Sequence, residues 1–169
     1  MRMLKSPQAL ATVVLLAGLA VIATAWGFQI IGGYVPCELC LEQRVPYYTA
    51  LPLTIFALLL MARQRFVLST GLMLMVAAVF AYGAGLGVYQ AGAEWGFWLG
   101  PTDCGGNVTA PSDAKDLIGA LGKVRLVSCT EASWRMFGLS FAGWNAVASA
   151  GLAVLALACA FFSYRRRGS

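Results

Sequence analysis

Between Arg65 and Glu94 the chain reads FVLSTGLMLMVAAVFAYGAGLGVYQAGA, which is 28 residues without a charged side chain. About 20 predominantly apolar residues are enough for an α-helix to cross the hydrocarbon core of a bilayer. Three further charge-free windows of 32, 18 and 29 residues lie between Lys5 and Glu38, between Arg44 and Arg63, and between Arg135 and Arg165. We therefore expect four transmembrane helices, over about residues 9–31, 45–62, 66–91 and 144–164.

The composition also indicates a chain that is solvated largely by lipid. Of its 169 residues 60% are hydrophobic and only 11% are charged, with a mean hydropathy of +0.75. The first window could be a cleaved signal peptide, since Arg2 and Lys5 precede it. Its apolar run is longer than the usual ~7–15 residue signal core, and three spans follow, so we expect a retained helix. The prediction is an all-α polytopic membrane protein, a four-transmembrane-helix bundle in one integral membrane domain over residues 1–169.

The distribution of charge predicts the orientation in the membrane. Both chain ends and the link between the second and third spans carry basic residues only: Arg2, Lys5, Arg63, Arg65, Arg165, Arg166 and Arg167. The other two loops, about residues 32–44 and 92–143, hold every acidic residue. The positive-inside rule places both termini in the cytoplasm and these loops outside. The net charge of +5 thus reflects topology and contact with lipid, and does not indicate nucleic acid as a partner.

The second outer loop contains a pattern typical of a short amphipathic helix. Apolar residues recur at helical spacing between Ser112 and Arg125 and alternate with charged ones. These apolar residues are Leu117, Ile118, Leu121 and Val124. We predict that this helix lies on the membrane surface.

Four of the five cysteines fall on the outer side, where disulfides persist. Cys37 and Cys40 form a C-x-x-C motif at the head of the second span, and Cys104 and Cys129 lie in the second outer loop. A Cys37–Cys40 bridge closes almost no loop, and such short rings are typically redox-active. Cys159 lies inside the fourth span, where we expect an inert, small apolar side chain.

Two other interpretations of these cysteines compete with a redox role. Static disulfides are possible, and a Cys104–Cys129 bridge would contribute roughly 3 kcal/mol by loop closure. Four cysteines could also bind zinc, but structural zinc sites usually combine two closely spaced ligand pairs. Here the second pair is separated by 25 positions, and the chain has no histidine.

Two neighbouring features suit thiol–disulfide chemistry. Arg44 follows Cys40 by four residues, so a helix would place its guanidinium on the same face. That cation favours a thiolate and could hold a negatively charged reduced ligand, although it could instead reach out to lipid headgroups. Cys104 precedes Gly105 and Gly106, in a loop that gives a foreign thiolate access.

The stretch PCELCLEQR over residues 36–44, the separated cysteine pair and the four spans together resemble the DsbB family of bacterial inner-membrane disulfide-generating proteins. The resemblance implies a protein-disulfide:quinone oxidoreductase. A reduced periplasmic thioredoxin-fold oxidase of the DsbA kind would attack the Cys104–Cys129 disulfide, at Cys104. Electrons would pass to Cys37–Cys40, and Cys40 would reduce a membrane quinone, ubiquinone or menaquinone. Arg44 would stabilise the charge that develops on the quinone.

One feature departs from the family pattern. Members often carry a histidine near the outer end of the third span, where this chain has Tyr89-Gln90-Ala91-Gly92. Gln90 could hydrogen-bond a quinone oxygen, but it cannot supply a proton at neutral pH.

Three alternative functions remain: a relative with one dedicated partner, a reductase like the vitamin K epoxide reductase group, or a transport or scaffold protein with static disulfides. Transport is disfavoured because no ionisable residue lies deep within a predicted span.

Overall fold

The computed structural model describes residues 6–100, 125–126, 132 and 134–166. Within these residues four helices are long and apolar enough to cross a membrane. They are α1 (Pro7–Ile30), α3 (Val45–Ala62) with the short α2 (Glu38–Glu42) ahead of it, α4 (Phe66–Glu94) and α6 (Phe141–Arg166). The predicted all-α, four-helix membrane bundle is thereby confirmed. Residues 112–124, which carry most of the predicted amphipathic helix, lie outside the described residues.

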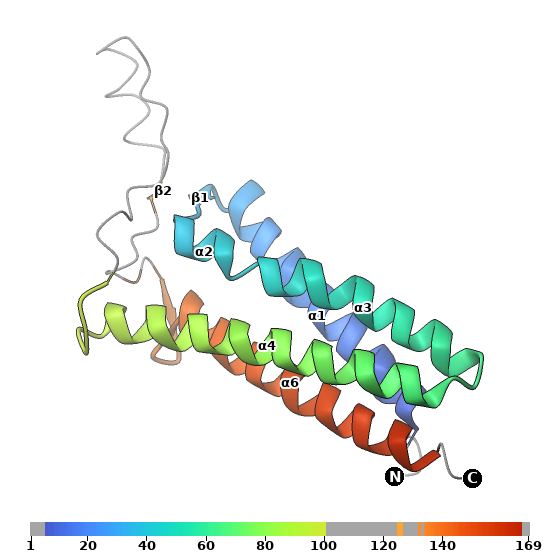
Figure 1. Cartoon of the computed structure of the whole chain (residues 1–169). Coiled ribbons are helices and arrows are strands. Elements are labelled where there is room, and N and C mark those ends of the chain that lie inside the picture. The colour runs from blue at the N-terminus through green and yellow to red at the C-terminus, as the bar shows by residue number, and fades with distance from the viewer. Residues whose placement is uncertain (1–5, 101–124, 127–131, 133, 167–169) are drawn as a thin grey trace, which may run out of the picture.

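The four long helices lie side by side in one bundle (Figure 1). Helix α1 packs against α3 and α6, and α4 packs against the same two helices, so the contacts close into a ring. The two chain termini lie at one end of the bundle, which we call the terminal end (Figure 1). The opposite end carries α2 and the Cys37–Cys40 pair, and we call it the cysteine end.

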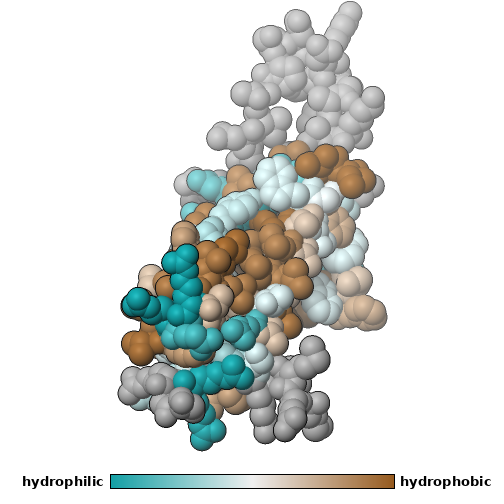
Figure 2. Space-filling model, turned by 90° about the vertical axis from the view of Figure 1, so that its right-hand side faces the viewer, coloured by the Kyte–Doolittle hydropathy of each residue, from teal (hydrophilic) through white to brown (hydrophobic). Residues whose placement is uncertain are grey.

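The surface of the bundle suits a lipid environment. Large apolar side chains such as Leu16, Phe56 and Val154 are 60–65% exposed along the helices. Figure 2 shows hydrophobic residues across the middle of the visible face and hydrophilic residues gathered toward the terminal end. Helices that are apolar all round, and not along one stripe only, are typical of membrane spans.

The core combines large apolar side chains with positions where helix backbones approach closely. Val14, Met73 and Phe80 are fully buried in one cluster that joins all four long helices. At Gly87 an added Cβ would lie 2.8–2.9 Å from backbone atoms of Ala142 and Ala146, so that only glycine permits this contact of α4 with α6. Small residues commonly allow such close packing in membrane proteins.

The helical backbone is interrupted just before the second predicted span. Helix α2 ends at Glu42, and α3 begins at Val45 with Pro46 in its first turn. Proline is tolerated there because the first backbone N–H groups of a helix have no partner to lose. The break leaves the side chains of Gln43 and Arg44 buried, at 6% and 9% exposure.

Two short strand pairs lie at the cysteine end. Strand β1 (Tyr34–Val35) pairs in parallel with β2 (Arg125–Leu126), so Arg125, the last residue of the predicted amphipathic helix, is in a strand. Strands β3 (Arg135–Met136) and β4 (Leu139–Ser140) form an antiparallel hairpin. Its turn residues Phe137 and Gly138 have φ values of 53° and 82°, as a tight hairpin turn requires.

Candidate functional site

Cys37 and Cys40 are joined by a disulfide at the start of α2, with their Cα atoms 5.0 Å apart. Cys37 is the N-cap residue of this helix, and its Sγ accepts a hydrogen bond from the backbone N–H of Cys40 at 3.2 Å. The side chain of Cys37 is fully buried, whereas Cys40 is partly exposed. The two sulfur atoms therefore have different access to their surroundings.

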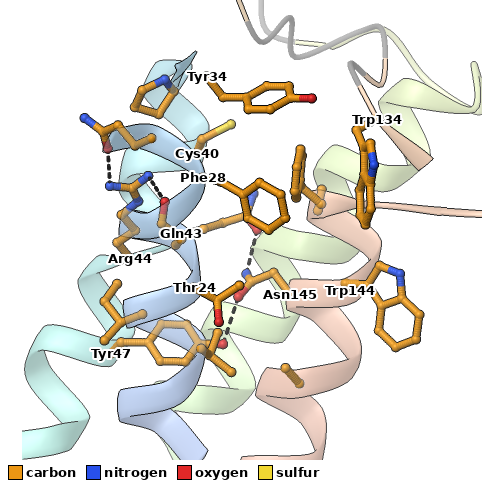
Figure 3. Close-up of a pocket in the computed structure, with 18 of the residues that line it drawn as sticks. Thr24, Phe28, Tyr34, Cys40, Gln43, Arg44, Tyr47, Trp134, Trp144 and Asn145 are labelled. Carbon is orange, nitrogen blue, oxygen red and sulfur yellow. Dashed lines mark hydrogen bonds between the residues drawn. The ribbon is translucent and has the colours of Figure 1, made fainter. Parts of the chain in front are cut away.

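A cavity of about 610 Å³ lies next to the disulfide, with walls chiefly from α1 and α6 (Figure 3). Cys40 lines it, and Cys37 does not. Most of its lining is apolar or aromatic, and the polar side chains on its wall include Thr24, Gln29, Gln43, Arg44, Gln90 and Asn145. An apolar pocket of this size with a few polar groups is typical of a site for a small organic ligand.

Arg44 forms one wall of the cavity and is held by α1. Its Nη1 donates to Gln29 Oε1 at 2.6 Å and its Nη2 to the carbonyl oxygen of Ala25 at 3.5 Å. The guanidinium also lies 5.3 Å from the ring centroid of Trp26, within the range of a cation–π contact. All these partners are neutral, so the positive charge of Arg44 acts on the cavity beside Cys40.

Four side chains from three helices and the α2–α3 junction form a continuous line of hydrogen bonds, which we call the amide chain: Tyr47, Asn145, Gln43 and Gln90. Tyr47 Oη donates to Asn145 Oδ1 at 2.8 Å, and Asn145 Nδ2 donates to Gln43 Oε1 at 2.6 Å (Figure 3). Gln43 Nε2 then donates to Gln90 Oε1 at 2.5 Å. The amide chain thus runs from the interior of the bundle toward the cysteine end.

The amide chain ends at the disulfide. Gln90 Nε2 lies 3.6 Å from Cys40 Sγ and 3.8 Å from Cys37 Sγ. The same nitrogen is 3.4 Å from Glu94 Oε1, one turn further along α4. Gln90 is only 2% exposed, so its amide is shielded from solvent and hydrogen-bonds to these neighbours and to Gln43.

An aromatic cluster of Phe28, Tyr34, Trp134 and Phe141 borders the same cavity. Phe141 lies at the centre of the cluster, with ring centroids 4.8 Å from Phe28, 4.8 Å from Trp134 and 5.7 Å from Tyr34. The cluster connects α1, β1 and the segment ahead of α6. It therefore ties the wall of the cavity to parts of both outer loops.

The structure brings together four of the six predicted site residues, Cys37, Cys40, Arg44 and Gln90. Cys104 and Cys129 lie outside the described residues. The free thiol Cys159 is buried at the terminal end, where its Sγ donates to the carbonyl oxygen of Pro7 at 3.1 Å.

The structure also bears on a possible metal site. Cys37 and Cys40 form a disulfide and so offer no thiolate to zinc. Within the described ranges no group of three or more histidine, cysteine or acidic side chains could hold a metal ion.

Three further side chains of the site, those of Gln43, Tyr47 and Asn145, were not predicted from the sequence. For Tyr47 and Asn145, which lie within predicted spans, a signal was present, since polar side chains are costly inside a membrane and usually face the bundle interior. Gln43 fell in the predicted outer loop and gave no such signal. All three side chains face the bundle interior here, and each hydrogen-bonds to at least one of the others.

The fold and the site define a multi-pass membrane protein with a C-x-x-C disulfide beside an apolar cavity, which is an arrangement for thiol–disulfide chemistry at the membrane surface. Comparison with protein families then identifies the family. The family model described as "Disulfide bond formation protein DsbB" matches residues 7–159, and the chain belongs to this family of disulfide-forming oxidoreductases.

Two curated relatives agree with this assignment. A "Disulfide bond formation protein B" from Verminephrobacter eiseniae (strain EF01-2) is 28% identical over 159 residues, covering 91% of this chain and 86% of the relative. Another from Polaromonas sp. (strain JS666 / ATCC BAA-500) is 27% identical over 153 residues, covering 89% of each. No solved structure gives a significant match.

Proposed function

We propose that the protein is a thiol:quinone oxidoreductase that reoxidises a DsbA-like, thioredoxin-fold oxidase and passes the electrons to ubiquinone or menaquinone. The observation that supports this most strongly is the exposure of Cys40, and not Cys37, to the apolar cavity that Arg44 also lines. A quinone headgroup is a flat ring with two carbonyl oxygens, which suits apolar walls with a few donors. When bound, a quinone supplies an acceptor for two electrons and two protons.

In the proposed sequence of steps, a thiolate of the reduced partner attacks the Cys104–Cys129 disulfide at Cys104. The partner becomes oxidised, and the two electrons reside on Cys104 and Cys129 as thiols. A thiolate of this pair then attacks the Cys37–Cys40 disulfide, which restores the first disulfide and reduces the second. Thiol–disulfide exchange of this kind needs only access and a thiolate.

The β1–β2 pairing supports transfer between the two cysteine pairs. Val35 is paired with Leu126 in parallel strands, and the chain continues from these residues to Cys37 and Cys129, two and three positions later. The strand pair thus joins the segment just ahead of the C-x-x-C motif to a segment of the second outer loop that precedes Cys129 by three positions in the sequence.

In the final step, Cys37 and Cys40 would form their disulfide again and give up two electrons and two protons to an acceptor in the cavity that Cys40, Arg44 and Gln90 line. The guanidinium of Arg44 would stabilise negative charge as it develops at the bound acceptor. Fixed charges in a site that excludes water act more strongly than the same charges in water.

The proposed location is the bacterial inner membrane, with both termini cytoplasmic and the cysteine end periplasmic, in a single integral membrane domain. Exposed arginines at the terminal end support this orientation by the positive-inside rule: Arg63, Arg65, Arg165 and Arg166. The periplasm is oxidising, which the disulfide requires.

Filling the cavity tests the quinone site. Ala148 on α6 lines the cavity, and Ala150 on the same helix is exposed on its outer face. We expect Ala148→Trp to raise the KM for quinone at least about tenfold, because a Trp side chain there occupies the volume that the ring needs. Ala150→Trp should leave it unchanged. Steady-state kinetics with a soluble quinone provide the measurement, and equal behaviour of the two variants would argue against a quinone in this cavity.

Arg44→Ala should raise the KM for quinone by about tenfold or more, while the rate of exchange with the reduced partner changes little. A charge-assisted contact is worth roughly 1.5–3 kcal/mol, and 1.4 kcal/mol corresponds to a factor of ten. Arg63→Ala is the matched control, since Arg63 is exposed at the terminal end. An unchanged quinone KM in Arg44→Ala would contradict the proposed role.

A further inference from the structure

The amide chain has one direction, which the groups at its cysteine end determine. A side-chain amide has a donor side and an acceptor side. Beside Gln90 the two sulfur atoms of the disulfide have no hydrogen to donate and can only accept, so the NH2 group of Gln90 must face them. Its carbonyl oxygen then faces the NH2 group of Gln43.

The same reasoning determines the direction of the other hydrogen bonds in the amide chain. The carbonyl oxygen of Gln43 accepts from Asn145, and the oxygen of Asn145 accepts from the hydroxyl of Tyr47. Tyr47 also contacts Ser149 Oγ at 2.9 Å, so this end is anchored in the bundle interior. Every donor in the amide chain therefore points toward the disulfide, and Gln90 cannot rotate without breaking the bonds behind it.

An N–H donor gains little from a disulfide, since sulfur in this state is a weak acceptor. Reduction changes the acceptor: two electrons enter, the S–S bond breaks, one sulfur takes a proton and the other remains a thiolate. Hydrogen bonds to a charged acceptor are about twice as strong as neutral ones. The amide of Gln90 is already aimed at both sulfur atoms and needs no reorganisation when the charge appears.

We propose that Gln90 stabilises the thiolate of the reduced Cys37–Cys40 pair, and that Gln43, Asn145 and Tyr47 are positioning residues that hold its amide. Stabilising the reduced form raises the reduction potential of a disulfide and makes it a stronger oxidant. The use of this effect rests on the proposed function, because a protein that reoxidises a strong oxidant needs a strongly oxidising disulfide of its own.

Other charged groups face the same region. Glu94 shares the amide of Gln90 and opposes a thiolate, and Arg135 Nη2 donates to the backbone oxygen of Glu94 at 3.4 Å. Arg44 lies on the cavity side of Cys40. The acidic side chains of α2, Glu38 and Glu42, are exposed. All of these groups remain in the variants proposed below, so a difference between variants reports the amide chain.

The test is the equilibrium between the Cys37–Cys40 pair and glutathione redox buffers, measured by alkylation of free thiols. The full-length protein is purified in detergent without quinone, with Cys104→Ser and Cys129→Ser to isolate the pair. Two glutathione thiols reduce the disulfide and leave as glutathione disulfide. We expect Gln90→Leu to shift this equilibrium about tenfold toward the oxidised form, which is about 30 mV for a two-electron couple.

Two further variants distinguish the effect of holding the Gln90 amide in position from the effect of its mere presence. Asn145→Leu keeps the Gln90 side chain but removes the hydrogen bond that holds Gln43, and through it Gln90, in position. It should shift the equilibrium in the same direction by about threefold, because the donor beside the cysteine pair is no longer fixed. Ser163→Ala removes a buried hydrogen bond of 2.8 Å to Ser69 at the terminal end and should cause no shift. A response of Ser163→Ala equal to that of Asn145→Leu would overturn the positioning role.

An unchanged equilibrium in folded Gln90→Leu overturns the proposal. Should that variant not fold, Gln90→Glu keeps the size of the side chain but replaces the donor with a carboxylate oxygen, and it should shift the equilibrium in the same direction by more than tenfold. No shift in this variant also contradicts the proposal. The redox equilibrium is measured without quinone turnover, so the two proposals can fail separately. Shifted equilibria in a protein that does not reduce quinone would contradict only the proposed function. Quinone reduction with unshifted equilibria would contradict only the role of Gln90.

Discussion

Cys40→Ala is expected to lower quinone reduction by at least about a thousandfold, as the loss of an essential nucleophile does in other enzymes. The reason is that Cys40 carries the only sulfur of the described C-x-x-C disulfide that lines the cavity. Without it neither the disulfide nor the thiolate that faces the acceptor can form. The measurement is the loss of quinone absorbance with a reduced thioredoxin-fold oxidase as electron donor.

Cys159→Ala is the matched control for this loss. Cys159 belongs to the membrane helix α6 and is buried at the terminal end against the carbonyl oxygen of Pro7. We expect its replacement to preserve turnover within about twofold, since it lies away from the disulfide. Turnover that survived in Cys40→Ala would show that the Cys37–Cys40 disulfide is structural.

Gly87→Val is expected to destabilise the bundle by about 1–3 kcal/mol or more, the usual cost of overpacking. Its Cβ would come within 2.9 Å of backbone atoms of Ala142 and Ala146, and backbone cannot move aside as a flexible side chain can. Helices α4 and α6 would have to separate, which would also displace Gln90 and Asn145 on their cysteine-end halves. Thermal unfolding in detergent gives the stability, and quinone turnover should fall with it.

Gly85→Val serves as the control for Gly87→Val. Gly85 is exposed on the same helix, and nothing lies within 4 Å of an added Cβ. Replacing an exposed glycine inside a helix should leave stability unchanged or raise it by up to about 1 kcal/mol. If both variants lost the same stability, the close approach of α4 and α6 would not be the cause.

Much of the fold could be predicted because a bilayer imposes length and composition on its spans. Charge-free windows indicated four membrane-spanning helices, and four helices of the described residues are long and apolar enough to cross a membrane. The predicted span 45–62, bounded by Arg44 and Arg63, coincides with α3, whereas the span predicted over 66–91 ended three residues too early. Helix α4 continues to Glu94, whose side chain accepts a hydrogen bond from Gln90 one turn earlier.

The candidate site could be predicted only where its residues are close in the sequence. Cys37, Cys40 and Arg44 belong to one short motif, and their spacing indicates their chemistry. The cavity depends on how α6 is placed beside α1, and the spacing of residues along one helix contains no information on its register with another. Asn145 illustrates the difference, because its role follows from hydrogen bonds to Gln43 and Tyr47, about 100 positions earlier.

In the proposed function, electrons pass from the thiols of a partner through this protein to a quinone. The most direct test is a single-turnover measurement on the purified wild-type protein in detergent, with a reduced thioredoxin-fold oxidase and a stoichiometric amount of ubiquinone or menaquinone. We expect one partner disulfide to form for each quinone reduced, with the disulfides of this protein restored at the end. Intact disulfides together with unreacted quinone of both kinds and a partner that stays reduced would contradict it.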